Sequence, residues 1–244
     1  MNRKLSMSAL KIIACISMLI DHLTYNFATF EEGDSLGYGI YLFGRCLGRP
    51  AFIIFAFALT EALFYTRSRG RYLVRLSILA VLSEPCFDFM IFGKKMGDAF
   101  LLRQNVLFLF IIAFAAIWGM EYLKEKYFVS LKYAYYFYSV LIIIMSGILV
   151  IFLGTDYGIT GLLCIYVFYF TRGNNRYTVV GMILWSVVAL FEGLDIEWFG
   201  LIALWPILGM YNGEKGRNLK AFFYIFYPVH MLLLTGIRFL VLGL

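Results

Sequence analysis

The side chains best suited to chemistry are Asp21 and His22, a carboxylate and an imidazole that adjoin deep inside the apolar segment of residues 8–30. Ionisable side chains are costly inside a bilayer, so those found there commonly belong to functional sites. Imidazole takes up and releases protons near neutral pH, which makes His22 a candidate general base. The alternative is a buried histidine with a structural role. His230, the second of the two histidines, lies in the last apolar segment.

Two pairs of charged residues, Arg45 with Arg49 and Glu84 with Asp88, could support such a base. The members of each pair are four residues apart, so they share one face of a helix. Carboxylates inside a membrane require cationic or hydrogen-bonding partners. The two arginines and the imidazole of His22 are the candidate partners.

Further polar residues are expected at a similar depth. Asn105 opens the fourth apolar segment, and Asp156 and Tyr157 form a tight turn before the sixth. Asp156 could either face a polar cavity or cap a helix. Glu61 could act in catalysis or form a structural ion pair with an arginine of another helix. We expect the polar residues in the outer half of the membrane to converge on one cavity between mid-membrane and the outer face.

Positive charge marks the opposite ends of the helices. Lys11 lies eleven residues before His22, which is about 16 Å along a helix and close to the same face. Arginine binds phosphate groups through paired hydrogen bonds. The Lys and Arg residues at these helix ends therefore predict a site for a polyanionic ligand. The alternative is that they only set membrane topology. The cations concerned are Lys11, Arg67, Arg69, Arg71, Arg75, Lys215 and Arg217.

The elements that must position these residues are membrane helices. The chain is 62% hydrophobic and only 15% charged, whereas a soluble domain carries about 25% charged residues. Its apolar runs are long enough to span a bilayer, which takes about 20 residues of helix. The four cysteines are scattered singly and give no disulfide or metal-binding pattern, so no metal is expected. The sequence predicts one all-α, polytopic integral membrane domain over residues 1–244.

Nine membrane helices are expected, with the sixth and eighth short for a full crossing. Their ranges are 8–30, 40–66, 72–92, 103–121, 133–153, 157–171, 177–192, 198–210 and 220–243. Most of the 21 Lys and Arg residues fall in alternate connections, and cytoplasmic loops are rich in these residues. This distribution predicts a cytoplasmic N-terminus and a multi-pass protein of the cell (inner, cytoplasmic) membrane. It also explains the net charge of +6 without a nucleic-acid partner.

The ordered set of polar motifs resembles the TraX family of membrane proteins. The segments that carry the resemblance are 10–22, 48–61, 65–69, 83–88, 104–105, 155–158, 211–216 and 224–230. The named activity of this family is N-terminal acetylation of a conjugative pilin subunit. The family is similar to the wider group of membrane acyltransferases that includes acyltransferase family three, in which acetyl-CoA from the cytoplasm modifies an outward-facing acceptor. That group often has an arginine where this chain has Lys11, which keeps the charge but loses the bidentate fork.

The resemblance implies a catalytic arrangement. Acetyl-CoA, the co-substrate, would bind the cytoplasmic cations, and His22 would act as general base on an acceptor amine or hydroxyl. Asp21 adjoins His22 but does not share its face, so a carboxylate of the later pair is the alternative orienting group. Arg49 or Asn105 would stabilise the developing oxyanion. The residues expected in catalysis are His22, Asp21, Glu84, Asp88, Arg49 and Asn105, and those expected to bind the acceptor are Arg45, Asp156, Tyr157 and His230.

We therefore expect an acetyl-CoA-dependent membrane acyltransferase that acts on a peptide N-terminus, a glycan or a small molecule at the outer side. A small-molecule transporter or flippase is the alternative, because it also needs buried charge and interrupted helices around a mid-membrane cavity. A non-catalytic assembly partner would explain the aromatic content, but not the concentration of His, Arg and carboxylate groups at one depth.

Overall fold

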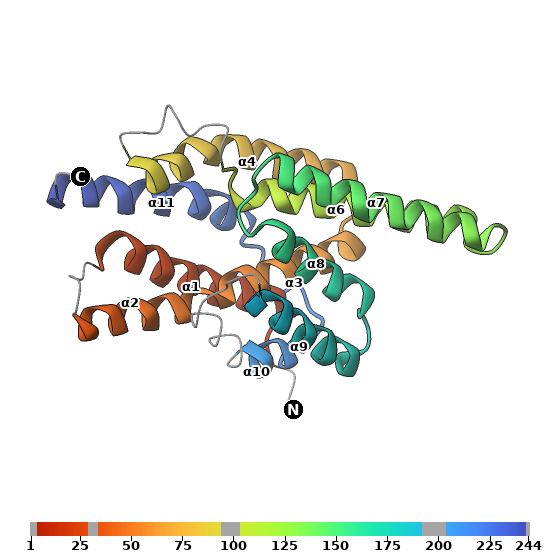
Figure 1. The fold of residues 1–244 in the computed structure, drawn as a ribbon, viewed down its shortest axis with the longest axis horizontal. Coiled ribbons are helices and arrows are strands. Elements are labelled where there is room, and N and C mark those ends of the chain that lie inside the picture. The colour runs from red at the N-terminus through yellow and green to blue at the C-terminus, as the bar shows by residue number, and fades with distance from the viewer. Residues whose placement is uncertain (1–3, 29–33, 94–102, 192–203, 243–244) are drawn as a thin grey trace.

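The computed structural model describes residues 4–28, 34–93, 103–191 and 204–242, and within these ranges it is helical without a named strand. Two isolated backbone bridges, Leu5 with Tyr211 and Gln104 with Thr155, join separate segments. The helices, shown in Figure 1, are α1 (Met7–Phe27), α2 (Ser35–Gly48), α3 (Pro50–Tyr65), α4 (Arg69–Phe92), α6 (Val106–Tyr127), α7 (Lys132–Phe152), α8 (Gly158–Phe170), α9 (Asn175–Phe191), α10 (Leu204–Gly209) and α11 (Lys220–Leu242).

Five helical stretches are long and apolar enough to cross a bilayer: Met7–Phe27, Ser35–Tyr65, Val106–Tyr127, Lys132–Phe152 and Lys220–Val241. The all-helical membrane character is thereby confirmed. α8 is apolar but short, and α4 begins with three arginines in its first two turns. The count of nine crossings and the cytoplasmic N-terminus stay predictions. Part of the predicted eighth segment, residues 198–203, lies outside the described residues.

The second predicted segment is divided into two helices at Arg49. Pro50 has no N–H group and opens α3, a position where the missing donor costs nothing. The end of α2 is held by Ser17 of α1, whose hydroxyl lies 2.6 Å from the carbonyl oxygen of Leu47 and 2.9 Å from that of Gly48. These bonds satisfy carbonyl groups that a helix end would otherwise leave without partners.

Short polar side chains fix where three helices begin. Ser6 accepts a hydrogen bond from the backbone N–H of Ala9, and Ser68 does so from that of Arg71. Asn105 caps α6 in the same way by accepting from the N–H of Leu107. Ser and Asn are preferred at this position because their oxygens satisfy the first exposed amides of a helix. The caps therefore set the register of α1, α4 and α6, which carry much of the polar chemistry.

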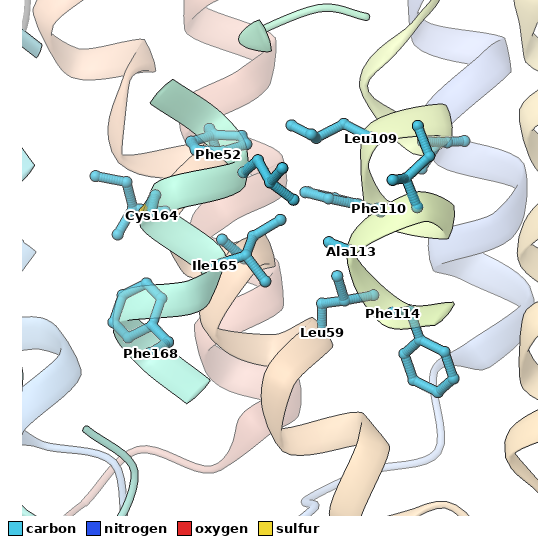
Figure 2. Packing of buried hydrophobic residues seen from close by; sticks show 14 of the residues in the cluster. Phe52, Leu59, Leu109, Phe110, Ala113, Phe114, Cys164, Ile165 and Phe168 are labelled. Carbon is cyan, nitrogen blue, oxygen red and sulfur yellow. The ribbon is translucent and has the colours of Figure 1, made fainter. Parts of the chain in front are cut away.

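The apolar core lies where α3, α6 and α8 meet (Figure 2). Its labelled side chains come from all three helices: Phe52, Leu59, Leu109, Phe110, Ala113, Phe114, Cys164, Ile165 and Phe168. The rings of Phe52 and Phe110 stack with their centroids 6.0 Å apart. Close packing of this kind stabilises helix association in lipid, where no hydrophobic force draws helices together. All four cysteines lie in described segments, where none forms a disulfide.

The polar half of the bundle is built around α1, α4 and α11. α1 packs against α2, α3 and α11, while α4 packs against α11 and α6. In Figure 1, α4 and α11 run beside each other, α1 and α2 form a neighbouring pair, and the α6–α7 hairpin extends to the far end. Because α11 contacts both α1 and α4, its side chains can join polar groups of these two helices.

Candidate active site

The structure pairs the two histidines of the chain across the α1–α11 interface. His22 Nδ1 lies 2.8 Å from His230 Nε2, and the two rings are within 6° of parallel. His230 Nδ1 in turn lies 2.7 Å from the backbone carbonyl oxygen of Phe226. The ring of Phe226 stacks on His230 at 4.6 Å between centroids. These contacts fix both the position and the plane of the two imidazoles.

The hydrogen bonds also fix the tautomers of two neutral rings. A carbonyl oxygen only accepts, so Nδ1 of His230 must carry the proton and its Nε2 must be an acceptor. His22 Nδ1 therefore donates to His230, which leaves Nε2 of His22 unprotonated. This nitrogen carries the lone pair that a general base requires. His22 keeps part of its side chain exposed, whereas His230 is only 5% exposed.

This arrangement differs from the expectation that a carboxylate orients His22. Asp21 instead pairs with Arg45, with 2.7 Å between Oδ2 and Nη1. The reason is geometric, because adjacent residues project from different sides of a helix. Asp21 faces α2, where it meets the backbone at Gly48. His230, which the sequence suggested only as a substrate-binding residue, is the hydrogen-bond partner of His22.

Arg45 and Arg49 lie near the histidine pair. Both are within electrostatic range of His22. Arg45 also has its guanidinium carbon 5.8 Å from the ring centre of Tyr25 and 6.0 Å from that of Tyr41. Arginine stacks favourably on aromatic rings. The break between α2 and α3 thus places two cations beside His22, as the sequence suggested.

Tyr157 closes this part of the site from the turn before α8. Its φ of 63° lies in the left-handed region, which a bulky residue seldom adopts and which other contacts must maintain. The ring stacks on Phe52 of α3 with 4.0 Å between centroids. Tyr157 is within electrostatic range of Arg49, Asp156 and Asp21. The turn therefore places the phenol of Tyr157 within electrostatic range of the arginines and carboxylates.

Asp156 pairs with Arg103 at 2.6 Å between Oδ1 and Nη2. The neighbouring backbone is joined as well, because the N–H of Asp156 donates to the carbonyl of Gln104 at 2.7 Å. Of the two roles left open for Asp156, capping a helix is not observed, since the residue at the start of α8 is Tyr157. The Asp156 carboxylate raises the pKa of the Arg103 guanidinium. This pair links the segment before α6 to the turn before α8.

Glu84 and Asp88 have different surroundings from those expected. Glu84 accepts hydrogen bonds through Oε2 from the backbone N–H of Asn105, at 3.1 Å, and from its side-chain amide. The same amide donates to the carbonyl of Ala80 at 3.0 Å. Asn105 thus uses both amide hydrogens, so it has none left for the oxyanion role that the sequence suggested. Asp88, one turn later, accepts no hydrogen bond from any residue that the structure describes.

Tyr227 of α11 lies near both the histidine pair and the carboxylates. Its ring centre lies 6.1 Å from that of His230, and it is within electrostatic range of Asp156, Glu84 and Tyr157. The polar residues of this half therefore lie within electrostatic range of one another, and they come from α1, α2, α4, α11 and the segments before α6 and α8. Within the described residues, no set of three His, Cys, Asp or Glu side chains could hold a metal ion.

Glu61 belongs to a separate ion pair. Its Oε1 lies 2.7 Å from Nε of Arg172, in the connection after α8. The guanidinium of Arg172 also lies over the ring of Phe64, 4.0 Å from its centre. Of the two roles considered for Glu61, the structure shows the interhelical ion pair, which fastens α3 to the α8–α9 turn.

The predicted donor-binding cations gather in part around the start of α1. The N–H groups of Met7 and Ser8 donate to the carbonyls of Glu214 and Lys215, at 2.8 and 3.1 Å. The N–H of Arg217 donates to Ser8 Oγ at 3.0 Å. The 210–217 loop is thereby held on the first turn of α1. Since this loop already occupies the free amides of that turn, an anion here would be bound by side chains.

Lys11 lies beneath this loop. It is within electrostatic range of Lys215, and its Nζ is 5.8 Å from the ring centre of Phe223. Arg67, Arg71 and Arg75 are exposed around the start of α4. Arg69 differs from them because its Nε donates to the carbonyl of Leu63 at 3.3 Å. The start of α4 lies near that of α11, since Tyr72 is within electrostatic range of Tyr224.

Replacing Gly216 by alanine is expected to lower the thermal stability of the protein. Gly216 has φ 70°, and a Cβ there would lie 2.7 Å from Ser6 Cβ and overlap the hydroxyl groups of Ser6 and Ser8. The left-handed backbone costs an alanine about 1–2 kcal/mol, and the steric overlap adds about 1–3 kcal/mol. The measurement is the unfolding temperature of the purified protein in detergent.

Gly213→Ala is the matched control, because Gly213 has φ 83° but its Cβ would meet nothing within 4 Å. It is expected to show the backbone cost alone. Equal unfolding temperatures for the two variants would contradict the described contact between the loop and α1.

Comparison with known proteins identifies the family of the chain. The sequence profile of the family described as TraX protein matches residues 6–238. The chain is 27% identical over 260 residues to the "Probable fimbrial assembly protein FimC, serogroup H1" of Dichelobacter nodosus, covering 98% of each chain. No solved structure shows significant similarity. With nearly its whole length matched by one profile, the chain belongs to the TraX family.

Proposed function

We propose that this chain is a membrane-embedded acetyltransferase, which moves the acetyl group of acetyl-CoA to an amine or hydroxyl of an acceptor at the outer side of the membrane. The observation that carries the proposal is the ordered His22–His230 pair. It presents an unprotonated Nε2 on a partly exposed imidazole at a depth where a histidine is otherwise costly. Membership of the TraX family supports the same reaction.

In this reaction His22 transfers one proton. Its Nε2 takes a proton from the attacking amine or hydroxyl while the new bond to the acetyl carbon forms and the carbon–sulfur bond breaks. The proton then passes to the leaving sulfur, which departs as the thiol. His230 accepts the hydrogen bond from Nδ1 throughout, so it holds the ring and stabilises the cation that forms on His22. Arg49 and Tyr157 lie beside this site and are suited to stabilise the developing oxyanion.

The donor is proposed to enter from the opposite end of α1. Lys11, Lys215 and Arg217 are placed there by the 210–217 loop, and the exposed arginines of α4 extend the positive surface. Phosphate groups of coenzyme A are suitable ligands for these cations. Lys11 and His22 are both on α1, about 16 Å apart along its axis. The donor's reactive end would have to cover this distance between the helices.

The acceptor is proposed to be a fimbrial or pilin subunit, because the relative in Dichelobacter nodosus is named a fimbrial assembly protein. The reacting group would be an amine of that subunit. A location in the cytoplasmic membrane, with the N-terminus inside, would place the donor cations toward cytoplasmic acetyl-CoA, in accordance with the positive-inside rule.

Binding of acetyl-CoA to the purified protein tests the proposal. Saturable thermal stabilisation is expected from acetyl-CoA and from coenzyme A. Lys215→Gln should raise the Kd by about 10- to 100-fold, since one charge-assisted hydrogen bond contributes about 1.5–3 kcal/mol. Lys132→Gln removes the same charge from α7, away from the 210–217 loop, and should leave the Kd unchanged.

A folded protein that shows no stabilisation at millimolar acetyl-CoA would contradict the proposal. That result would favour a transporter or flippase. The prolines inside α4 and α11 are compatible with that alternative, since they interrupt two helices that pack against each other.

A further inference from the structure

A second feature of the polar half is the unequal hydrogen bonding of Glu84 and Asp88. Both carboxyl groups are on α4, one turn apart, and both are buried, with 3% and 1% exposure. Oε2 of Glu84 accepts two hydrogen bonds from Asn105, which is itself fully buried. Hydrogen bonds from donors stabilise the ionised form of a carboxylate. These bonds favour the ionised form of Glu84 over that of Asp88, although Oε1 of Glu84 is buried without a hydrogen-bond partner among the described residues.

Asp88 has no such support. Neither Oδ1 nor Oδ2 has a hydrogen-bond partner, and no ion pair is formed by this residue in the described part of the chain. An isolated carboxylate removed from water without partners is strongly disfavoured, and such a group takes up a proton instead. A neutral carboxylic acid is much cheaper to bury.

Among the described residues, no cation is within electrostatic range of either carboxyl group. This includes Arg238 of α11, the helix that packs against α4. Asp156 and Tyr227 are within electrostatic range of Glu84, and Cys86 is nearby on α4 itself. Each of these side chains is neutral or negative. α6, the other helix packed on α4, contributes the uncharged Asn105. Among the described residues, the charge around the two carboxyl groups therefore favours one negative charge at most.

We infer that Glu84 and Asp88 form a proton-binding site, in which Asp88 holds a proton at neutral pH and Glu84 is the ionised partner. Glu84 accepts hydrogen bonds and Asp88 accepts none from the described residues. Such a difference in surroundings separates the pKa values of two neighbouring acids. The ligand of the site is the proton itself. The inference depends on burial, hydrogen bonding and the charges around the two carboxyl groups, so it is independent of acetyl transfer and of acetyl-CoA binding.

Infrared spectroscopy of the full-length protein with isotope-labelled aspartate tests the inference directly. The wild type in detergent at neutral pH is expected to show the C=O stretch of a protonated aspartic acid. Asp88→Asn should lose this band. Asp34→Asn is the matched control, because Asp34 is exposed and caps α2 through Oδ1, which asparagine can also do. Its band should equal that of the wild type.

The pH dependence of stability provides a second readout. A residue that is protonated when folded and ionised when unfolded makes the folded state bind one more proton. The folded-to-unfolded ratio should then fall by up to about tenfold per pH unit as the pH rises above the range in which an unfolded aspartate titrates. Asp88→Asn should lose this contribution, and Asp34→Asn should keep it.

Two results would overturn the inference. One is the absence of a protonated-aspartate band in the folded wild type. The other is a change in the stability of the wild type when choline replaces sodium at constant ionic strength, together with no such change in Asp88→Asn. The second result would mean that an ionised Asp88 binds a metal cation rather than a proton.

Discussion

Replacing His22 by alanine is expected to slow acetyl transfer by about 10²–10⁴-fold, the usual contribution of a positioned general base. The acceptor would have no nearby group to take its proton as the new bond forms. Binding of acetyl-CoA should be unchanged, because Lys11, Lys215 and Arg217 lie at the far end of α1. The measurement is transfer of labelled acetyl from acetyl-CoA to a fimbrial subunit, with the Kd for acetyl-CoA determined in parallel.

His230→Gln is the informative companion variant. It removes the imidazole that accepts from Nδ1 of His22 but keeps an uncharged acceptor of similar reach. A smaller loss of rate is expected, together with a shift in the pH profile of kcat/KM, which a purely structural role would not produce. Wild-type transfer by folded His22→Ala would contradict the proposed role of His22. Loss of acetyl-CoA binding in that variant would show that His22 acts through packing instead.

Gly48→Ala is expected to destabilise the protein by about 1–3 kcal/mol or more, the cost of overpacking a close contact. A Cβ at this position would overlap Asp21 and lie 2.6 Å from its Cγ. Asp21 would have to move, which would disturb its ion pair with Arg45 and the packing of α2 on α1. The measurement is the free energy of unfolding in detergent, or the unfolding temperature where unfolding is irreversible.

Gly39→Ala provides the control within the same helix. A Cβ there would meet nothing within 4 Å, and alanine is the better helix former. Its stability should equal or exceed that of the wild type. If Gly48→Ala were as stable as Gly39→Ala, the close approach of α1 and α2 at Asp21 would be contradicted.

The sequence predicted the helices well because their apolar runs and caps are local signals. The division at Arg49 was missed, although Pro50 is a signal for it. A proline that opens a helix and one that kinks it are hard to distinguish without the neighbouring helix, which here supplies Ser17 to hold the end of α2. Local signals thus located the segments but not each boundary.

The polar residues of the site were identified by type and depth, whereas their partners were not. Spacing along a helix tells which residues share a face, but not which helix that face will meet. Asp21, Glu84 and Asp88 were all candidates to orient His22, and Asp21 pairs with Arg45 instead. Glu84 was expected to meet an arginine or His22, although its partner is Asn105. His230 was recognised as a buried histidine, but nothing local to it indicates a bond to a residue in the first helix.

The contact between His22 and His230 joins residues 208 positions apart. A ribosome delivers α1 to the membrane long before α11 has been made, so for most of biosynthesis the imidazole of His22 has no partner to set its tautomer or its plane. The loop that closes on the first turn of α1 arrives late as well. A nascent or truncated chain is therefore expected to be inert, and the chemistry would switch on only when the last helix has inserted correctly.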